Sequence, residues 1–228
     1  MSTIKSLPDP IINCNNKDVY HPSDDSYLII DYLKNHVNEK YFDDIDIKNI
    51  NKILDLGTGT GIIAIFLHLL QKVNLNFKAE IYGSDISKEA IECAKHNAKA
   101  NNLGDKIKFF ISNLFQSFPN SLKHSFDIII FNPPYLPSLG ENKSKELIDL
   151  SWNGGKEGYE IIIQFLDTAK NFLNTNHNCY IYFISSSKTD LGKLNELLKQ
   201  RGLNQQILKK KHLFFEDILL NRINFTKF

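Results

Sequence analysis

The feature that most constrains the fold of this chain is a regular alternation of strand-like and helix-like segments between residues 50 and 200. Strands are expected at residues 52–56, 79–85, 106–112, 126–131 and 179–185. Helices with an apolar side are expected at residues 62–70, 158–173 and 190–200, and another from the N-cap Ser87 to about Asn102. This alternation predicts an α/β fold, in which a parallel sheet carries helices on both faces.

The end of the chain has a different pattern. Residues 203–213 and 219–228 are two strand candidates with a short connection, which predicts an antiparallel hairpin that closes the sheet. The polar residues 43–51 and 141–145 are expected to form loops, the second of them mobile, and residues 1–18 an irregular N-terminal segment. A length of 228 residues fits a single domain over residues 1–228.

Composition and charge narrow the class of protein. A net charge of +1 gives little electrostatic attraction for nucleic acid, so stable nucleic-acid binding is not expected. No signal-peptide pattern and no apolar run near the ~20 residues of a membrane span are present, so no membrane association is expected. Cys14, Cys93 and Cys179 are odd in number and far apart, so they predict neither a disulfide framework nor a metal site. A reducing compartment, the cytoplasm, is expected.

A glycine turn follows the first strand. Asp55 precedes Gly57, Gly59 and Gly61, and Ile62 stands where a dinucleotide fingerprint would have a glycine. A carboxylate in this turn repels a pyrophosphate and attracts an ammonium group. Asp85 ends the second strand, where its carboxylate can accept hydrogen bonds from both hydroxyls of a ribose. Together these acids indicate S-adenosylmethionine, a cofactor with an amino group, a ribose and no phosphate.

Two alternatives to this cofactor site remain open when the turn is considered by itself. A glycine turn can simply allow a helix to pack tightly on a strand, and it can also bind NAD. Similarly, Asn113 and Leu114 follow the third strand, where a polar side chain and a backbone N–H could contact adenine. A simple turn asparagine is an equally good interpretation of Asn113.

The most specific motif is Asn132-Pro133-Pro134-Tyr135, directly after the fourth strand. The two prolines restrict the backbone and lack N–H donors, so the loop presents carbonyl acceptors, to which the Asn132 side chain adds another. Tyr135 adds a flat face on which a planar amide or base can stack. A loop of acceptors favours a substrate with an NH₂ group over a carbonyl or a phosphate.

With these motifs, the chain resembles the class I S-adenosylmethionine-dependent methyltransferases, and among them the HemK-type protein-glutamine methyltransferases. It is most similar to the eukaryotic and archaeal branch, which methylates the glutamine of the Gly-Gly-Gln motif in class I peptide chain release factors. The likeness rests on residues 19–28, 55–61, 132–135, 152–158 and 223–228, together with Asp85. It implies a Rossmann-like fold with a mostly parallel seven-stranded sheet.

The resemblance also implies roles for matching positions. Cofactor-binding residues would be Tyr20, Ser26, Asp55, Gly57, Thr58, Gly59, Gly61, Asp85, Ile86, Asn113, Leu114 and Asn132. Catalytic residues would be Asn132, Pro133, Pro134 and Tyr135, with Asn132 Oδ1 and the Pro133 carbonyl accepting the two amide N–H groups. The chain departs from the family at His21 and Asp24, and at Asn113, where the branch usually has Asp.

Partners follow from the same resemblance. The third strand, residues 107–111, is expected at an edge of the sheet, with Phe109 and Phe110 placing apolar side chains on both faces. The family branch is activated by a small zinc-binding protein that pairs with this edge, so such a partner is expected beside the release factor substrate. The alternative is that a helix of the chain itself covers the edge.

Two other functions compete with protein methylation. An adenine-N6 or cytosine-N4 nucleic-acid methyltransferase uses the same four-residue motif, because an exocyclic NH₂ is chemically close to an amide. The second competing function is that of a binding module that kept the fold and lost catalysis. The presence of Asp55, Asp85 and Asn132 argues against this function. Trp152 is expected to be a packing residue rather than part of a substrate cleft, and Lys209, Lys210 and Lys211 a solvated strand face.

Overall fold

A seven-stranded sheet forms the centre of the computed structural model, which describes residues 9–14, 16–138 and 152–225. The strand order within these residues is β5-β4-β3-β6-β7-β9-β8. The strands are β3 (Lys52–Leu56), β4 (Glu80–Asp85), β5 (Ile107–Ile111), β6 (Ile128–Phe131), β7 (Cys179–Ser186), β8 (Gln205–His212) and β9 (Asp217–Phe225). Both pairings of β9 are antiparallel and all others are parallel, which confirms the mostly parallel sheet and its C-terminal hairpin.

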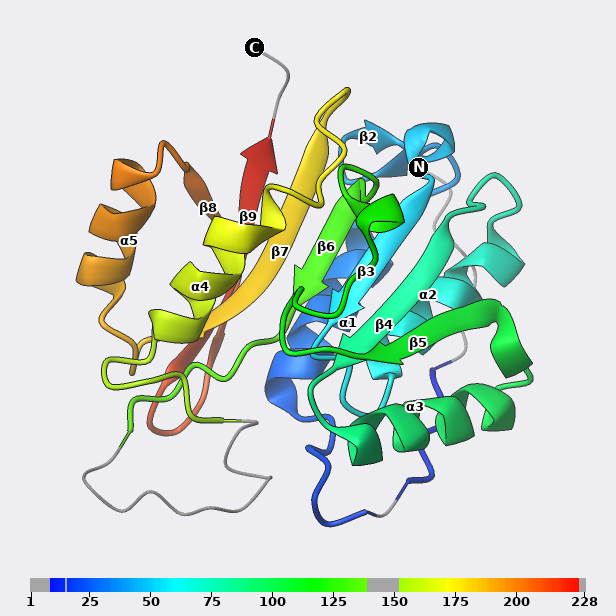
Figure 1. Ribbon diagram of the computed structural model, residues 1–228, viewed down its shortest axis with the longest axis horizontal. Coiled ribbons are helices and arrows are strands. Elements are labelled where there is room, and N and C mark those ends of the chain that lie inside the picture. Colours follow the sequence, from blue (N-terminus) through cyan, green and yellow to red (C-terminus); the bar gives the residue numbers. More distant parts are fainter. Residues whose placement is uncertain (1–8, 15, 139–151, 226–228) are drawn as a thin grey trace.

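Helices cover both faces of this sheet (Figure 1). They are α1 (Asp24–His36), α2 (Ile62–Val73), α3 (Lys88–Ala100), α4 (Glu160–Ala169) and α5 (Leu191–Gln200). In Figure 1, α4 and α5 lie in front of the sheet and α1 and α2 behind it. The expected N-cap Ser87 is confirmed, because its Oγ accepts a hydrogen bond from Ala90 N. The helix expected at residues 158–173 is shorter, since Gly158 has a φ of 85° and the helix begins two residues later.

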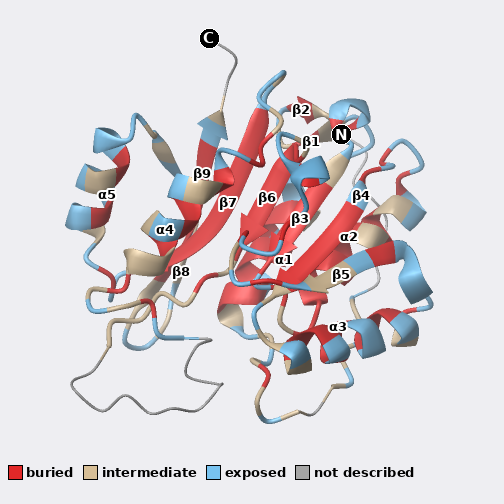
Figure 2. Ribbon diagram, in the orientation of Figure 1, coloured by how far each residue is buried: buried red, intermediate tan, exposed pale blue. Residues whose placement is uncertain are grey.

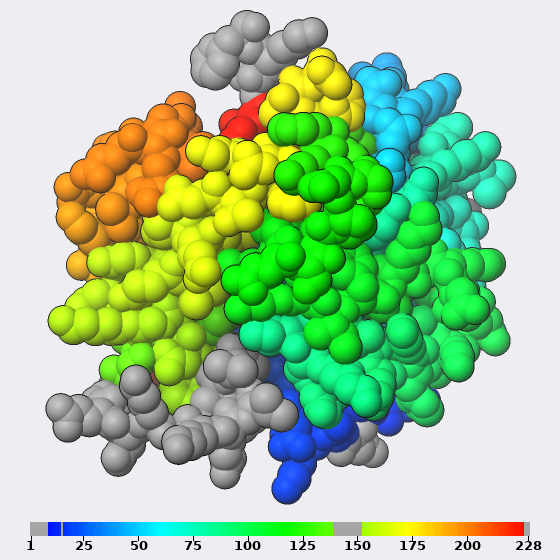
Figure 3. Space-filling model, in the orientation of Figure 1, coloured from blue at the N-terminus to red at the C-terminus, as the bar shows by residue number. Residues whose placement is uncertain are grey.

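The sheet separates two large apolar clusters, and a third, small cluster lies around Val19, Ala90 and Cys93. Strands β6 and β7 are buried along their whole length, as parallel strands covered on both faces must be (Figure 2). On the front face, in the connection after β5, Phe115 stacks against Phe165 and Phe172. Phe118 meets Phe172 edge to face. This connection and α4 lie next to each other over the sheet in the space-filling view (Figure 3).

The prediction of a loop over residues 43–51 is wrong. This stretch contains β2 (Ile45–Asp46), which pairs with β1 (Tyr41–Phe42), and a 3₁₀ helix, η1 (Ile47–Asn49). Asp43 made the stretch look solvent-exposed, but its carboxylate accepts hydrogen bonds from Tyr32, Tyr182 and Arg222. Polar side chains that are paired with one another can be buried, and a count of polar residues does not detect such pairing. Residues 141–145 lie outside the described residues.

The cysteine prediction is also wrong, because Cys14 and Cys93 form a disulfide across 79 residues of sequence. Cys179 is buried and free. Residues 9–14 and 16–18 contain no helix or strand, as expected, but they run back along α3. There the Asn101 side chain exchanges hydrogen bonds with the backbone N and O of Ile11, and Asn97 Oδ1 accepts one from Asn13 N. This path brings Cys14 to α3, which the linear spacing could not indicate.

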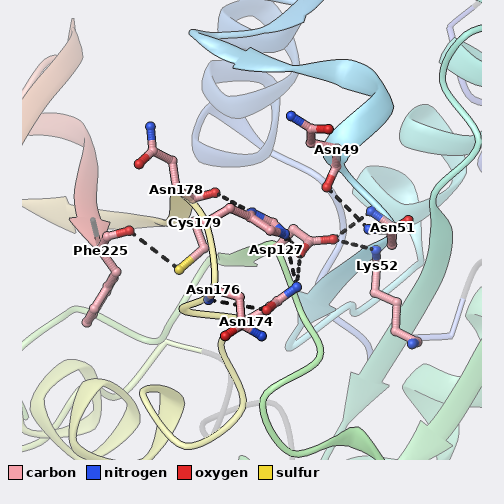
Figure 4. A network of polar contacts seen from close by, with 10 residues as sticks. Asn49, Asn51, Lys52, Asp127, Asn174, Asn176, Asn178, Cys179 and Phe225 are labelled. Carbon is pink, nitrogen blue, oxygen red and sulfur yellow. Dashed lines mark hydrogen bonds and ion pairs between the residues drawn. The ribbon is translucent and has the colours of Figure 1, made fainter. Parts of the chain in front are cut away.

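A buried carboxylate holds together the amino edge of the sheet (Figure 4). Asp127 is fully buried just before β6, and its Oδ2 accepts hydrogen bonds from Asn51 N at 2.6 Å and Lys52 N at 3.0 Å, beside the start of β3. Its Oδ1 accepts a third from Asn174 Nδ2 at 2.9 Å. The polar network at this edge is therefore structural, and the opposite edge, where the strands end, is available for ligands.

Candidate active site

Loops from three strands of the sheet surround one cavity of about 340 Å³ at its carboxyl edge. The glycine turn follows β3, Asp85 ends β4 and the motif beginning at Asn132 follows β6. Because β4, β3 and β6 are neighbours and parallel, their ends meet at the point where the strand order reverses. Predicted site residues that line this cavity are Tyr20, Ser26, Gly57, Thr58, Gly59, Asp85, Ile86, Asn113, Leu114, Asn132, Pro133 and Pro134.

The glycine turn has the backbone geometry that only glycine adopts without strain. Gly57, Gly59 and Gly61 have φ values of 64°, 53° and 83°. A Cβ on Gly61 would lie 3.0 Å from Ala94 Cβ, so this glycine allows α2 to approach α3 and does not line the cavity. Gly57 and Gly59 do line the cavity. The interpretation as a helix-packing turn therefore applies to Gly61, and the interpretation as a ligand-binding turn applies to Gly57 and Gly59.

Asp55 lies behind the cavity wall, with only 1% of its surface exposed. Its Oδ2 accepts hydrogen bonds from Thr58 Oγ1 at 2.6 Å and Ala64 N at 3.1 Å, but its buried Oδ1 has no partner among the described residues. Burial raises the pKa of this carboxyl to about 7. A cation placed near the free oxygen would be attracted to the carboxylate and would stabilise its charged form.

Asp85 is held rigidly at the end of β4. Its Oδ2 accepts a hydrogen bond from Gly59 N and its Oδ1 one from Ser87 N, each at 2.9 Å. Burial raises the pKa of this carboxyl, whereas these backbone donors lower it. Each carboxylate oxygen can accept further hydrogen bonds, so the group can still bind two hydroxyls of a ligand.

Asn132 contributes the second unpaired acceptor of the site. Its Oδ1 is buried and has no hydrogen-bond partner in the described part of the chain, while the residue lines the cavity. An unpaired buried acceptor is rare in folded proteins and costs free energy unless a ligand supplies the donor. The atom is therefore suited to accept a hydrogen bond from the NH₂ group of a substrate.

Tyr135 lies in a second cavity of about 200 Å³ beside the first. The cavity is lined by Tyr20, Ser23, Asp24, Asp25, Tyr135, Leu136, Trp152, Leu213, Glu216 and Ile218. Trp152 is 38% exposed there, so its predicted role as a packing residue is not supported, and the cleft interpretation fits better. The motif thus contributes to both cavities, Asn132 to the first and Tyr135 to the second.

Asp25 connects the two cavities, and sequence reasoning did not identify it. It lines both and is 3% exposed, and its Oδ2 accepts hydrogen bonds from Tyr20 at 3.0 Å and Tyr135 at 3.3 Å. Burial and the negative charge of Asp25 raise the pKa of both tyrosines, so both remain donors at neutral pH. The sequence did contain one indication that Asp25 belongs to the site. This residue lies within the motif of residues 19–28, on the first turn of α1.

The first cavity fits an elongated ligand with a cationic amino group and a ribose. Asp85, Asn113 and Leu114 line this cavity, and Asp55 lies behind its wall with one unpaired oxygen, so the site offers two separate carboxylates to such a ligand. The described residues contain no group of three or more side chains that could hold a metal ion. None of the helices in the described ranges is both long and apolar enough to cross a membrane.

Comparisons with known proteins identify similar chains. The family model described as "Methyltransferase domain" matches residues 47–210. A putative protein N5-glutamine methyltransferase of Methanocaldococcus jannaschii is 32% identical over 203 residues, which cover 89% of this chain and 90% of that protein. The mouse methyltransferase HEMK2 is 26% identical, with 82% and 80% covered, and a release factor glutamine methyltransferase of Aquifex aeolicus is 31% identical, with 74% and 57% covered.

Solved structures share the fold. The E. cuniculi Mtq2–Trm112 complex, described as responsible for methylating the eRF1 translation termination factor, has a chain with a TM-score of 0.58 at 23% identity. That match covers 90% of this chain and 98% of the other. A METTL16 methyltransferase domain has a TM-score of 0.63 at 17% identity, with 97% and 89% covered. At these identities the structures support the fold alone.

Proposed function

Because the chain belongs to the methyltransferase-domain family and, within it, to the HemK-type protein N5-glutamine methyltransferases, we propose that it methylates a glutamine side-chain nitrogen in the Gly-Gly-Gln motif of a class I peptide chain release factor. The relatives named for this reaction support the substrate class. The observation that carries the proposal is the buried, unpaired Oδ1 of Asn132 beside a cavity suited to the cofactor.

S-adenosylmethionine is the cofactor that we propose for the first cavity, where it would supply a methyl group on a sulfonium centre. Asp55 would balance the charge of its amino group, and Asp85 would bind its ribose. Asn113 and Leu114 would contact its adenine, and Tyr20 and Ser26 would close the cavity from the N-terminal side. Solved relatives of the same fold include complexes with S-adenosylhomocysteine.

The chain would contribute mainly by positioning the substrate. Asn132 Oδ1 and the Pro133 carbonyl would accept the two N–H groups of the glutamine amide and direct its nitrogen toward the cofactor. Tyr135, fixed by its hydrogen bond to Asp25, would pack against the amide plane. Alignment of reacting groups of this kind can contribute ~7–11 kcal/mol to lowering a barrier. The N–C bond would form as the bond from that carbon to the sulfonium sulfur breaks, and the nitrogen would release its proton to water after the transfer, so no base would be required beforehand.

An activator protein is the second partner that we propose. Strand β5 is at the edge of the sheet, as expected, and Ile111 at its end is 47% exposed. A protein of the same fold was solved as a complex with Trm112, which supports a small protein partner for this chain. We propose that the partner of this chain binds zinc and pairs with the β5 edge. We propose the cytoplasm as the compartment because the substrate is a translation factor; the Cys14–Cys93 disulfide removes the argument from unpaired cysteines.

The test uses isotope-labelled S-adenosylmethionine with the purified protein and its activator. The acceptors are a Gly-Gly-Gln release factor, the same factor with Gln→Ala, and DNA oligonucleotides. Label in the first acceptor and not in the second would support glutamine methylation. Label in DNA alone would assign the motif to a nucleobase, and label in none of them would contradict the proposed substrate.

A further inference from the structure

The tip of the β8–β9 hairpin carries two adjacent phenylalanines in solvent. Phe214 is 88% exposed and Phe215 is 78% exposed, and their rings meet edge to face with centroids 4.6 Å apart. Exposed apolar residues are common singly, but neighbouring aromatic rings on the same turn are typical of binding surfaces. We call these two residues the aromatic tip.

The hairpin holds the aromatic tip in a defined place. Leu213 N donates a hydrogen bond to Glu216 O at 2.7 Å, which closes the turn and leaves the two phenylalanines between them pointing outward. Glu216 is in turn bound by Ser186 Oγ, at the end of β7. Close to the turn, Lys211 forms an ion pair with Asp24 on α1. The tip is therefore anchored to β7 and to α1, and Asp24 and Asp25 at the start of α1 line the second cavity.

The aromatic tip lies next to the substrate side of that site. Leu213, Glu216 and Ile218, which flank it in the hairpin, line the second cavity together with Tyr135 and Trp152. In Figure 1 the turn between β8 and β9 lies at the carboxyl edge of the sheet, beside the segments on either side of residues 139–151. A macromolecule that places its NH₂ group at Asn132 would thus extend over this hairpin.

We propose that the aromatic tip is a docking surface for the methyl-accepting protein, where it binds an apolar side chain in the segment that flanks the methylated glutamine. This inference rests on the proposed function. Charge favours a protein over a nucleic acid, because the intervening cavity is lined by the carboxylates of Asp24, Asp25 and Glu216. Within the described residues, one cation lies at ion-pair distance from these three carboxylates: Lys211, which pairs with Asp24. A phosphate backbone would be repelled there.

The experiment compares two acceptors with the same Gly-Gly-Gln sequence, an intact release factor and a short peptide that lacks the segments flanking this motif. The double variant Phe214→Ser, Phe215→Ser is assayed beside Leu75→Ser, a matched control that removes an 80% exposed side chain at the amino edge of the sheet. We expect the double variant to raise KM for the intact factor at least tenfold and to leave its kcat unchanged. Its KM for the peptide, its cofactor affinity and its melting temperature should match those of the control.

Two results would overturn the inference while the wild-type enzyme remains active on the factor. One is an unchanged KM for the intact factor, and the other is an equal loss on factor and peptide, which would indicate damage to the active site itself. If the wild-type protein labels DNA and the double variant loses that label, the tip binds nucleic acid instead. Failure of the wild-type protein to label either Gly-Gly-Gln acceptor would contradict the proposed function, and the docking surface with it.

Discussion

At the scale of single residues, two unpaired oxygen atoms define the candidate site. Asp55 Oδ1 and Asn132 Oδ1 are both buried without a hydrogen-bond partner in the described ranges, and they come from the ends of the neighbouring strands β3 and β6. Leaving a buried acceptor unpaired costs about 1–3 kcal/mol. The folded chain tolerates this cost at the positions where a cofactor and a substrate would supply the missing donors.

Replacing Asn132 with alanine should remove one of the two fixed acceptors for the substrate amide. We expect kcat/KM to fall about 10²–10³-fold, as for the loss of one preorganised hydrogen-bonding group elsewhere. Cofactor affinity, measured by calorimetry, should change much less. Asn204→Ala is the control, since this exposed asparagine lies outside both cavities. Wild-type turnover by the Asn132 variant would contradict its catalytic assignment.

Asp55 should make both cofactor binding and stability depend on pH. Burial raises the pKa of its carboxyl from 3.8 to about 7 in the folded protein, so the folded state keeps a proton that the unfolded state releases between pH 4 and 7. The cofactor-free protein should therefore lose stability as the pH rises through this window, and the raised pKa of Asp85 adds to the trend. Cofactor affinity should instead fall as the pH drops below 7, because the carboxyl that attracts the ammonium group becomes protonated.

Melting curves and titration calorimetry between pH 5 and 8 would check both trends. The Asp55→Asn variant keeps the shape of the side chain and removes its charge, so its melting temperature should vary less with pH. A wild-type cofactor affinity that stays constant across this range would exclude Asp55 as the partner of the amino group.

At the scale of secondary-structure elements, the two edges of the sheet differ in how readily a strand of another protein could pair with them. Strand β8 carries Lys209, Lys210 and Lys211 and has a register shift between Ile207 and Lys209, both of which discourage another strand from adding. The prediction of a solvated lysine face holds only for Lys210, which is exposed; Lys209 and Lys211 are half-buried, and Lys211 forms an ion pair with Asp24. Strand β5 carries mostly apolar side chains and ends in the half-exposed Ile111, so it is the edge open to a partner.

A proline substitution in β5 should prevent partner binding without preventing folding. Ser112 N donates to Asp85 O, so alternate residues of β5 point their N–H groups toward β4, and that of Ile111 points away. Ile111→Pro therefore removes an outward donor, and we expect it to abolish co-purification with the activator while the melting temperature of the isolated chain falls little. Ile111→Val, which keeps the donor, should bind normally. Equal binding by both variants would show that the partner does not pair with this edge.

At the scale of the whole molecule, the N-terminal segment links α3 to the candidate site. Asn97 on α3 is fully buried and binds both Asn13 N and Thr60 O, so it holds this segment against the glycine turn. The segment then passes the Cys14–Cys93 disulfide and reaches Val19 and Tyr20, which line the first cavity. The disulfide therefore tethers one wall of that cavity to the helix behind it.

Removing the disulfide should destabilise the protein. We expect Cys14→Ser to lower the free energy of unfolding by about 2–4 kcal/mol under oxidising conditions, because the bond closes a long loop in the unfolded chain. A strong dithiol reductant should lower the melting temperature of the wild-type protein and leave that of the variant unchanged. Thiol titration of the unfolded wild-type protein should detect one thiol, that of Cys179, before reduction. Three thiols would contradict the bond.

Much of the fold and the first cavity followed from local patterns. Apolar strands of five to seven residues and the N-cap Ser87 predicted the main elements with small errors at their ends. Helix α1 and the β1–β2 pair were not predicted, because their polar residues find buried partners on distant strands, as Asp43 does with Tyr182. Asp25 was missed for the same reason. One of its two tyrosine partners, Tyr20, is close in sequence, but the other, Tyr135, is 110 residues away.

The order of elements and the residues at strand ends could be inferred from sequence, because strand and helix periodicity and turn residues act over short distances along the chain. They indicated the parallel sheet, its ligand-binding edge and the motif that begins at Asn132. Three features required the folded structure: the disulfide between Cys14 and Cys93, the shared carboxylate of Asp25, and the position of Phe214 near the second cavity. Each depends on segments that are distant in sequence and meet only when the sheet and its helices pack together.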